Sequence, residues 1–104
     1  MTSSPHVFRD ASNRLTHDRS DIDSVSYPDV CRKVADHFGL KPCSELVVGP
    51  DQQFWDFTDG TSTLELAWDN WCGFTATAKE TTAEPLVHSI ADFLSEALPP
   101  RSGQ

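Results

Sequence analysis

The chain has 104 residues and a formal net charge of −8, so one small domain is the simplest expectation. Residues 1–49 carry seven acids and six bases, whereas residues 50–104 carry nine acids and two bases. Nucleic acid and anionic membrane surfaces are poor partners for such a chain, because binding phosphate groups needs clustered Lys and Arg. The negative field would attract a basic protein surface, although simple solubility also explains it.

Both ends of the chain are polar. Residues 1–26 are rich in Ser, Asp, Arg, His and Asn, and their few apolar residues show no sustained period. Residues 99–104 contain no large apolar residue. Such segments bury too little apolar surface to offset the entropy lost on folding, so both are predicted to be disordered tails. Residues 27–98 are then a single domain, small enough that homodimerisation is an alternative way to complete the core.

The first predicted helix spans residues 27–38, with Ser26 as its N-cap and Gly39 as the residue that ends it. Its apolar side chains recur at helical spacing on one side, which indicates a helix packed on a core. These residues are Tyr27, Val30, Cys31, Val34, Ala35 and Phe38. A connector follows, and residues 46–48 are predicted to form a short strand.

Two further strands are predicted at residues 53–58 and 61–68, joined by Asp59 and Gly60. Asp-Gly between two apolar-rich runs is a strong signal for a two-residue hairpin turn, which sets Thr58 opposite Thr61. Because side chains alternate along a strand, one face is predicted to be apolar and the other polar. The apolar face carries Trp55, Phe57, Leu64, Leu66 and Trp68, and the other carries Phe54, Asp56, Thr58, Thr61, Thr63, Glu65 and Ala67.

The turn after Trp68 decides the faces of the next strand. A three-residue loop of Asp69, Asn70 and Trp71 pairs Trp68 with Cys72. This loop points Cys72, Phe74, Ala76 and Ala78 to the core, and it leaves Trp71 exposed at the tip. The strand at residues 75–78 is an unpaired edge that could accept another strand. The last helix is predicted from about Thr82, its cap, to Leu98, before two prolines.

The predicted fold class is therefore α+β, with the order α-β-β-β-β-α. The four strands form an antiparallel meander, and both helices cover its apolar face in a two-layer sandwich. The Thr-rich face is left in water.

Few residue patterns point to catalysis. Cys31 and His37 are six residues apart on a helix, about 240° around its axis, so they do not form a nucleophile and base. His88 and Asp92, four apart on the last helix, are an alternative metal or base site, but an ordinary solvated pair has the same spacing. Asp56 and Glu65 are predicted to be neighbours without being directly opposed, on a face too open for strong acid–base chemistry.

The remaining signals exclude more chemistry than they suggest. Cys43 is the thiol most expected to be exposed, in a loop that contains a proline. Phosphate-binding loops, nucleophile elbows and zinc-protease motifs are absent from the sequence, so no cofactor is predicted. Three scattered cysteines, together with the lack of an apolar leader or membrane span, predict a cytoplasmic protein with free thiols.

The best binding feature is an aromatic turn with acids beside it. Trp71 is predicted exposed next to Asp69 and Asn70, and exposed Trp is a typical interface anchor. Phe54, expected beside Val47, lies with Asp56 and Glu65 on the Thr-rich face. The predicted function is a non-enzymatic, acidic protein-binding module, similar in profile to immunity proteins, inhibitors and secretion chaperones. The alternative is a small enzyme or metal-binding domain that uses His88 and Asp92, or Asp56 and Glu65.

Overall fold

The protein is a small α+β domain, and its computed structural model describes residues 6–99. In chain order the elements are β1 (Val7–Arg9), β2 (Leu15–Arg19), α1 (Tyr27–Phe38), β3 (Lys41–Pro42), β4 (Val47–Val48), β5 (Gln52–Thr58), β6 (Thr63–Asp69), β7 (Gly73–Ala78), a 3₁₀ turn (Thr81–Ala83) and α2 (Glu84–Ala97). Across these described residues, seven strands form one antiparallel sheet in the order β1-β2-β7-β6-β5-β3, with β4 also paired to β5.

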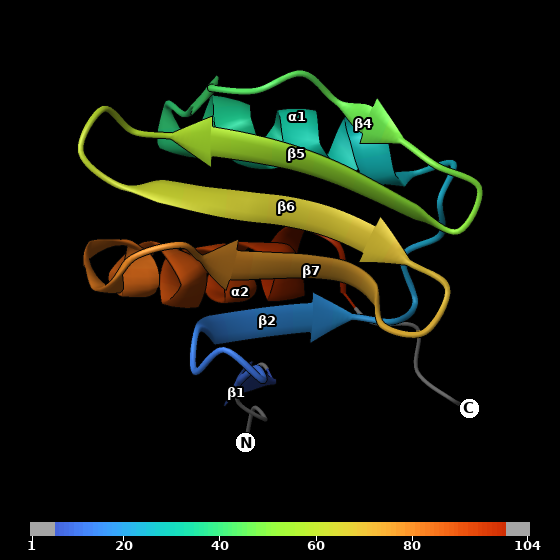
Figure 1. Cartoon of the computed structure of the whole chain (residues 1–104), viewed down its shortest axis with the longest axis horizontal. Coiled ribbons are helices and arrows are strands. Elements are labelled where there is room, and N and C mark those ends of the chain that lie inside the picture. The colour runs from blue at the N-terminus through green and yellow to red at the C-terminus, as the bar shows by residue number, and fades with distance from the viewer. Residues whose placement is uncertain (1–5, 100–104) are drawn as a thin grey trace.

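Both helices lie behind the sheet in the view of Figure 1, α1 behind β5 and β6, and α2 behind β7 and β2. The face that they cover is the predicted apolar face. Its buried residues include Phe57, Leu64, Leu66, Phe74 and Ala76 from the sheet, and Val30, Cys31, Val34, Ile90 and Leu94 from the helices. Within this core the Tyr27 hydroxyl donates a hydrogen bond to the carbonyl of Leu66. The two-layer arrangement follows because a sheet with one apolar face must bury it against apolar helix stripes.

The number of strands differs from the predicted four-stranded meander. The short strand β3 lies in the segment predicted to be a connector, and its residue Lys41 pairs with Thr58 of β5. Strands β1 and β2 lie in the segment predicted to be a disordered tail. The prediction for residues 1–26 is therefore wrong for Val7–Arg9 and Leu15–Arg19, while residues 1–5 and 100–104 lie outside the described part of the chain.

The position of β2 also corrects the prediction of a free edge at β7. Strand β2 pairs with β7 from Thr16 opposite Thr77 to Arg19 opposite Phe74. The core-facing residues of β2 include His17 and Arg19, two polar residues, and this mixture hides the apolar alternation that marks a strand. The Arg19 guanidinium is satisfied there by two hydrogen bonds to the Asp21 carboxylate, at 2.8 and 2.7 Å, and one to the Leu94 carbonyl, at 3.2 Å.

Both hairpin turns differ from the prediction. The β5–β6 turn is longer than two residues, and the β6–β7 turn starts one residue later than predicted. The β5–β6 register sets Thr58 opposite Thr63, and the β6–β7 register sets Trp68 opposite Phe74. Each pairing is displaced by two residues from the prediction. Because side chains alternate with period two, a displacement of two leaves every residue that is still paired on its predicted face. Thr61 and Cys72 were predicted to be strand residues but lie in the turns, and Cys72 is half-buried instead of in the core. The faces of the paired residues are therefore correct although the individual pairs are not.

The helix boundaries are close to the predicted ones, but the caps differ. Helix α1 spans residues 27–38 as predicted, and Gly39 follows it with a φ of +66°. Ser26 makes no side-chain cap; its N–H instead donates to the Asp23 carboxylate at 2.9 Å. Helix α2 begins at Glu84, two residues after the predicted cap Thr82, because a 3₁₀ turn occupies residues 81–83. Neither helix of the described chain has the length and apolarity needed to cross a membrane.

A glycine at the start of β7 permits a close approach between two turns. Gly73 has a φ of +72°, and a Cβ at this position would lie 2.5 Å from the carbonyl oxygen of Arg19 and 2.6 Å from the Cα of Ser20. The turn that carries Trp71 is thus packed against the chain just after β2. A side chain at residue 73 has no room there, so the position of this turn depends on the glycine.

We expect Gly73→Ala to lower the free energy of unfolding by about 3 kcal/mol, since it adds a backbone clash to left-handed strain. Gly39→Ala is the matched control, because Gly39 also has a positive φ but a Cβ there would meet no neighbouring atom within 4 Å. It should cost about 1 kcal/mol from strain alone. Urea unfolding of both variants measures the difference, and equal losses would contradict the close packing at Gly73.

Candidate functional site

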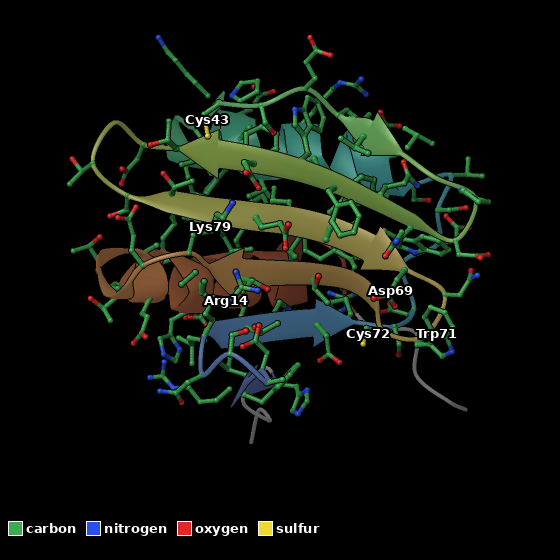
Figure 2. The ribbon with its side chains drawn as sticks, in the orientation of Figure 1. Arg14, Cys43, Asp69, Trp71, Cys72 and Lys79 are labelled. Carbon is green, nitrogen blue, oxygen red and sulfur yellow. The ribbon has the colours of Figure 1, made fainter. Side chains whose placement is uncertain are left out.

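The sheet face opposite the helices carries the acidic residues singled out in the sequence. Figure 2 shows this face, with Arg14 and Lys79 labelled on it. Asp56 of β5 and Glu65 of β6 are directly opposed in the sheet, a closer pairing than predicted. The Lys79 ammonium donates a hydrogen bond to the Asp56 carboxylate at 2.9 Å. This ion pair raises the pKa of Lys79 and partly neutralises the acidic face.

Glu65 is the least compensated acid of this face. Its side chain is half-buried, and burial raises the pKa of its carboxyl, with a further contribution from the neighbouring Asp56 charge. The charges of Lys79 and Arg14 act in the opposite direction. Glu65 is therefore an anion that a further positive charge, supplied by a partner, would stabilise.

The Thr-rich face is less open to water than predicted. Thr16 and Thr77 are opposed across β2 and β7 and are both buried, with their hydroxyl oxygens 3.2 Å apart. Ala67 is buried on the same face, whereas Phe54 is half-buried and lies opposite Val47, as predicted. The polar face is therefore partly closed around β2 and β7, and its acids Asp56 and Glu65 are half-buried.

The turn from β6 to β7 holds its tryptophan outward. Trp71 is 79% exposed, which confirms its predicted exposure at the tip. The Asp69 carboxylate accepts hydrogen bonds from the backbone N–H groups of Trp71 and Cys72, at 2.8 and 2.6 Å. The Asn70 side chain donates to the Asp51 carboxylate at 2.8 Å, which ties this turn to the β4–β5 turn. These bonds fix the backbone around Trp71 while its side chain stays in water.

Three more exposed apolar side chains lie at the same end of the sheet as Trp71. They are Val25, 85% exposed, Val47, 57% exposed, and Val48, 67% exposed. We call these four residues the apolar end. Their segments meet at one end of the sheet in Figure 1, where the β2–α1 connection, β4 and the β6–β7 turn come together. The Gln53 side chain, opposite Val48, donates to the Ser24 carbonyl at 3.2 Å and so connects two of these segments.

Sequence reasoning missed the three valines. Val25 stands in the segment assigned to the tail, and Val47 and Val48 were expected to belong to an ordinary strand. The signal that could have exposed them is length: a strand of two residues has too few ladder bonds and neighbours to bury a pair of valines. Exposed apolar side chains at one end of a domain are characteristic of interaction sites. Val47 and Val48 are neighbours along β4 and face opposite sides of the sheet, so the apolar end wraps around the sheet edge.

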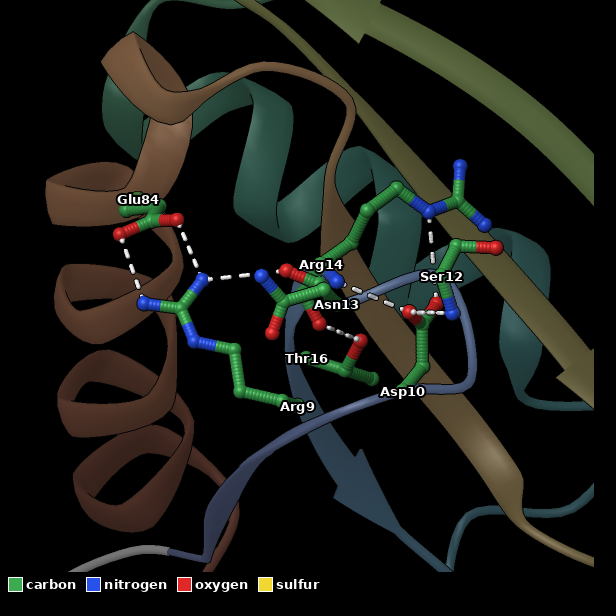
Figure 3. A network of polar contacts seen from close by, with 7 residues as sticks. All are labelled: Arg9, Asp10, Ser12, Asn13, Arg14, Thr16 and Glu84. Carbon is green, nitrogen blue, oxygen red and sulfur yellow. Dashed lines mark hydrogen bonds and ion pairs between the residues drawn. The ribbon is translucent and has the colours of Figure 1, made fainter.

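Charge is distributed unevenly between the two ends of the sheet. At the end away from Trp71, acids are paired with bases: Arg9 with Glu84 at 2.5 Å, Arg14 with Asp10 at 3.3 Å, and Lys79 with Asp56. Figure 3 shows the first two pairs in their network. Beside the apolar end, Asp51 and Asp69 accept hydrogen bonds from amide groups, and no described basic side chain forms an ion pair with either. The charges of Asp51 and Asp69 are thus without a basic partner next to exposed apolar surface, whereas Asp21, which follows β2 at the same end, is paired with Arg19.

Apart from Asp56 and Glu65, the candidate catalytic and metal residues form no shared site in the described part of the chain. His88 and Asp92 are both exposed on α2, and no group of three or more His, Cys, Asp or Glu suited to a metal ion occurs within residues 6–99. Cys31 is buried in the core, where burial raises the pKa of its thiol to about 12. His37 instead stacks on Phe93, with ring centroids 4.1 Å apart. Cys43 is exposed, as predicted.

A cavity of about 440 Å³ opens between the first turns of α1 and the end of α2. Ile22, Val30 and Leu98 supply apolar parts of its lining, and Arg19 and Asp21 supply charge. Since the Arg19 guanidinium already binds the Asp21 carboxylate and the Leu94 carbonyl, its charge stabilises the fold.

Comparison of the chain with protein-family models, curated proteins and solved structures finds no match.

We expect Glu65→Gln to raise the free energy of unfolding at pH 7 by roughly 0.5 kcal/mol, because it removes a half-buried charge that faces Asp56. A carboxyl whose folded-state pKa is raised destabilises the fold when ionised, so this gain should disappear as the pH falls and Glu65 binds a proton. Urea unfolding at pH 7 and pH 4 measures it.

Asp59→Asn is the control, because it should change the free energy of unfolding at pH 7 in the opposite direction. Backbone hydrogen bonds from Ser62 and Thr61 lower the pKa of Asp59, so its charge stabilises the fold at neutral pH and this contribution is lost on acidification. Asp59→Asn should lower stability at pH 7. A loss of stability in Glu65→Gln at pH 7 would contradict our account of the acidic face.

Proposed function

We propose that this protein is a non-enzymatic binding module for a basic protein partner, of the kind represented by immunity proteins, inhibitors and secretion chaperones. One observation carries the proposal. The four exposed large apolar side chains of the described chain share one end of the sheet, and two carboxylates beside them, Asp51 and Asp69, form no ion pair with a described basic side chain. An apolar surface with a charged rim is what a specific protein contact requires.

Trp71 is the expected anchor of this contact. A tryptophan buries a large area and loses little conformational entropy on binding, because it has two rotatable side-chain bonds. The backbone beneath it is already ordered by the bonds to Asp69 and between Asn70 and Asp51. Ordering the turn on binding then costs little, so most of the gain from burying the indole would appear as affinity.

The acids would supply orientation and speed of association. Asp69 and Asp51 surround the anchor, and Glu65 and Asp56 extend negative charge along the open face, with Phe54 half-buried near them. Because like charges repel and opposite charges steer approach, a basic partner would be selected and an acidic one rejected. We infer a cytoplasmic location for the module, since its three cysteines are all free thiols.

The alternative of an acid–base site at Asp56 and Glu65 has one supporting feature, their direct opposition. The pair nevertheless lies on an open face, and Lys79 already binds Asp56. General acid–base catalysis needs a carboxyl held away from water beside a substrate pocket. We therefore propose that these carboxylates act through their charge, as contacts for a cationic partner.

We expect Trp71→Ala to weaken partner binding by at least about 2 kcal/mol, or roughly 30-fold in Kd, as for a central interface anchor. The change should leave thermal stability nearly unaltered because the side chain is exposed. Affinity capture from native lysate at low and moderate salt, comparing the wild type with the variant, identifies the partner. Purified components then give the Kd.

Equal binding by wild type and Trp71→Ala would show that the anchor is wrongly chosen. Capture of no protein at either salt, combined with a dimer mass in light scattering, would favour homodimerisation through this surface instead.

We expect Asp51→Asn to slow association with the partner several-fold at low salt, with less effect on dissociation, since it removes uncompensated charge beside the anchor. The amide oxygen can still accept the hydrogen bond from Asn70. Asp92→Asn is the matched control: it makes the same charge change at an exposed position on α2, outside the β4–β5 and β6–β7 turns. Surface plasmon resonance at several salt concentrations measures both. Equal effects of the two variants would mean that only net charge matters.

A further inference from the structure

The sheet edge at β7 is covered by the N-terminal hairpin, which we define as residues 6–19, comprising β1, β2 and their turn. Strand β2 pairs with β7, and β1 pairs with β2 at three positions, from Val7 opposite His17 to Arg9 opposite Leu15. Without this hairpin, β7 would present a row of unpaired backbone groups along an edge with an apolar side. The hairpin thus stands where an added strand from a partner would otherwise bind.

Polar contacts on both sides hold the hairpin in place. On the open face, the His6 ring lies 2.6 Å from the Asp18 carboxylate. On the helix-facing side, Arg19 binds Asp21 and the Leu94 carbonyl, and Arg9 binds Glu84 at the start of α2, as drawn in Figure 3. Each of these polar groups therefore has a hydrogen-bond partner.

His17 is the exception within the hairpin. Its side chain is 2% exposed and shares the helix-facing side with Ala76 of β7 and Val7 of β1, its two cross-strand neighbours. Nδ1 lies 2.6 Å from the His6 carbonyl oxygen, and since a carbonyl can only accept, Nδ1 carries the proton. Nε2 is then the unprotonated nitrogen, and it is buried with no hydrogen-bond partner. A neutral ring tolerates this position, whereas a protonated ring would bury a donor and a charge.

The charged groups around His17 offer no acceptor for a proton on Nε2. From its own strand, Asp18 faces the opposite side of the sheet and binds His6, while Arg19 is cationic. The titratable or charged groups of β1 and the residue before it are Arg9 and His6. The Arg9 guanidinium donates its hydrogen bonds to the Glu84 carboxylate of α2. The histidine of α2, His88, is exposed, and β7 presents Phe74, Ala76 and Ala78 on this side. Burial accordingly lowers the pKa of His17.

We propose that protonation of His17 releases the N-terminal hairpin and uncovers β7 as an edge that accepts an extended strand. The strand that fits this edge places apolar side chains where Leu15 and His17 now face the helices, and polar ones where Thr16 and Asp18 face the open side. A competing strand with an apolar residue in place of His17 has no protonation cost in acid. This property goes beyond the binding proposed for the apolar end and does not depend on it.

The direction of the pH dependence follows from linkage. In the released hairpin His17 is in water and has its ordinary pKa, about 6.5, whereas in the docked hairpin its pKa is lower. Below about pH 6.5 the released state therefore binds more protons, and the docked state loses stability as the pH falls towards the folded-state pKa. One proton corresponds to a change of at most about tenfold per pH unit in the docking equilibrium.

Amide hydrogen exchange followed by NMR tests the release. Between pH 6.5 and pH 5, protection of the paired β2 and β7 amides, corrected for intrinsic exchange rates, should fall by up to about tenfold per pH unit. The variants His17→Leu and His17→Phe should abolish this slope, and two are used in case one fails to fold. His88→Gln, which removes an exposed histidine, should keep it. A slope that persists in the His17 variants overturns the proposal, as does an equal loss of protection in α1 and β5, which would indicate global unfolding.

A labelled peptide tests the uncovered edge. Its sequence is residues 6–20 of this chain with His17→Leu, and the probe protein is the full wild-type chain. Binding measured by fluorescence anisotropy should be up to about tenfold stronger at pH 5.5 than at pH 7.5, and the unsubstituted peptide should bind less well at pH 5.5. Affinity that is independent of pH, or equal for the two peptides, overturns the proposal.

Discussion

The alternation of side chains along β5, β6 and β7 is the constraint on which the rest of the molecule depends. Phe57, Leu64, Leu66, Phe74 and Ala76 all project to one face, so that face must be buried, and the apolar stripes of α1 and α2 are the surfaces available to bury it. Once both helices lie on this side, the acids of the opposite face and the turns at the sheet ends are what the molecule can show to a partner. The candidate site therefore lies on the surfaces that remain exposed once the core has formed between the sheet and the two helices.

The same alternation explains how much of the fold could be predicted. It assigned residues to faces correctly even though both hairpin registers were displaced by two, because a displacement of two conserves the face. The pairings themselves depend on turn chemistry. Asp59 and Asp69 each accept two backbone N–H groups with their carboxylates, and these bonds set where each turn closes. A side chain that substitutes for a backbone turn bond is hard to anticipate from spacing alone.

The N-terminal hairpin could not be predicted for a different reason. A strand is recognised by apolar residues at every second position, and β2 has His17 and Arg19 at two of its helix-facing positions. Their burial is possible through contacts that are remote in sequence, such as the bond from Arg19 to the Leu94 carbonyl. The exposure of Trp71 was predictable, because a turn residue between two strands is outside the alternation. That Val25 and Val48 lie at the same end required the three-dimensional arrangement.

Arg19 and His17 show how two polar residues on one buried strand face can have opposite consequences. The Arg19 guanidinium donates to a carboxylate and a carbonyl, so its buried charge is satisfied in the folded protein. His17 is satisfied at one nitrogen only, and its charge depends on pH. A core residue with a fully paired charge stabilises a single arrangement, whereas one with an unpaired titratable nitrogen makes the arrangement conditional. His17 belongs to β2, the strand that covers β7, so pH controls whether the edge of β7 is accessible. The remaining core is held by apolar contacts, which do not titrate.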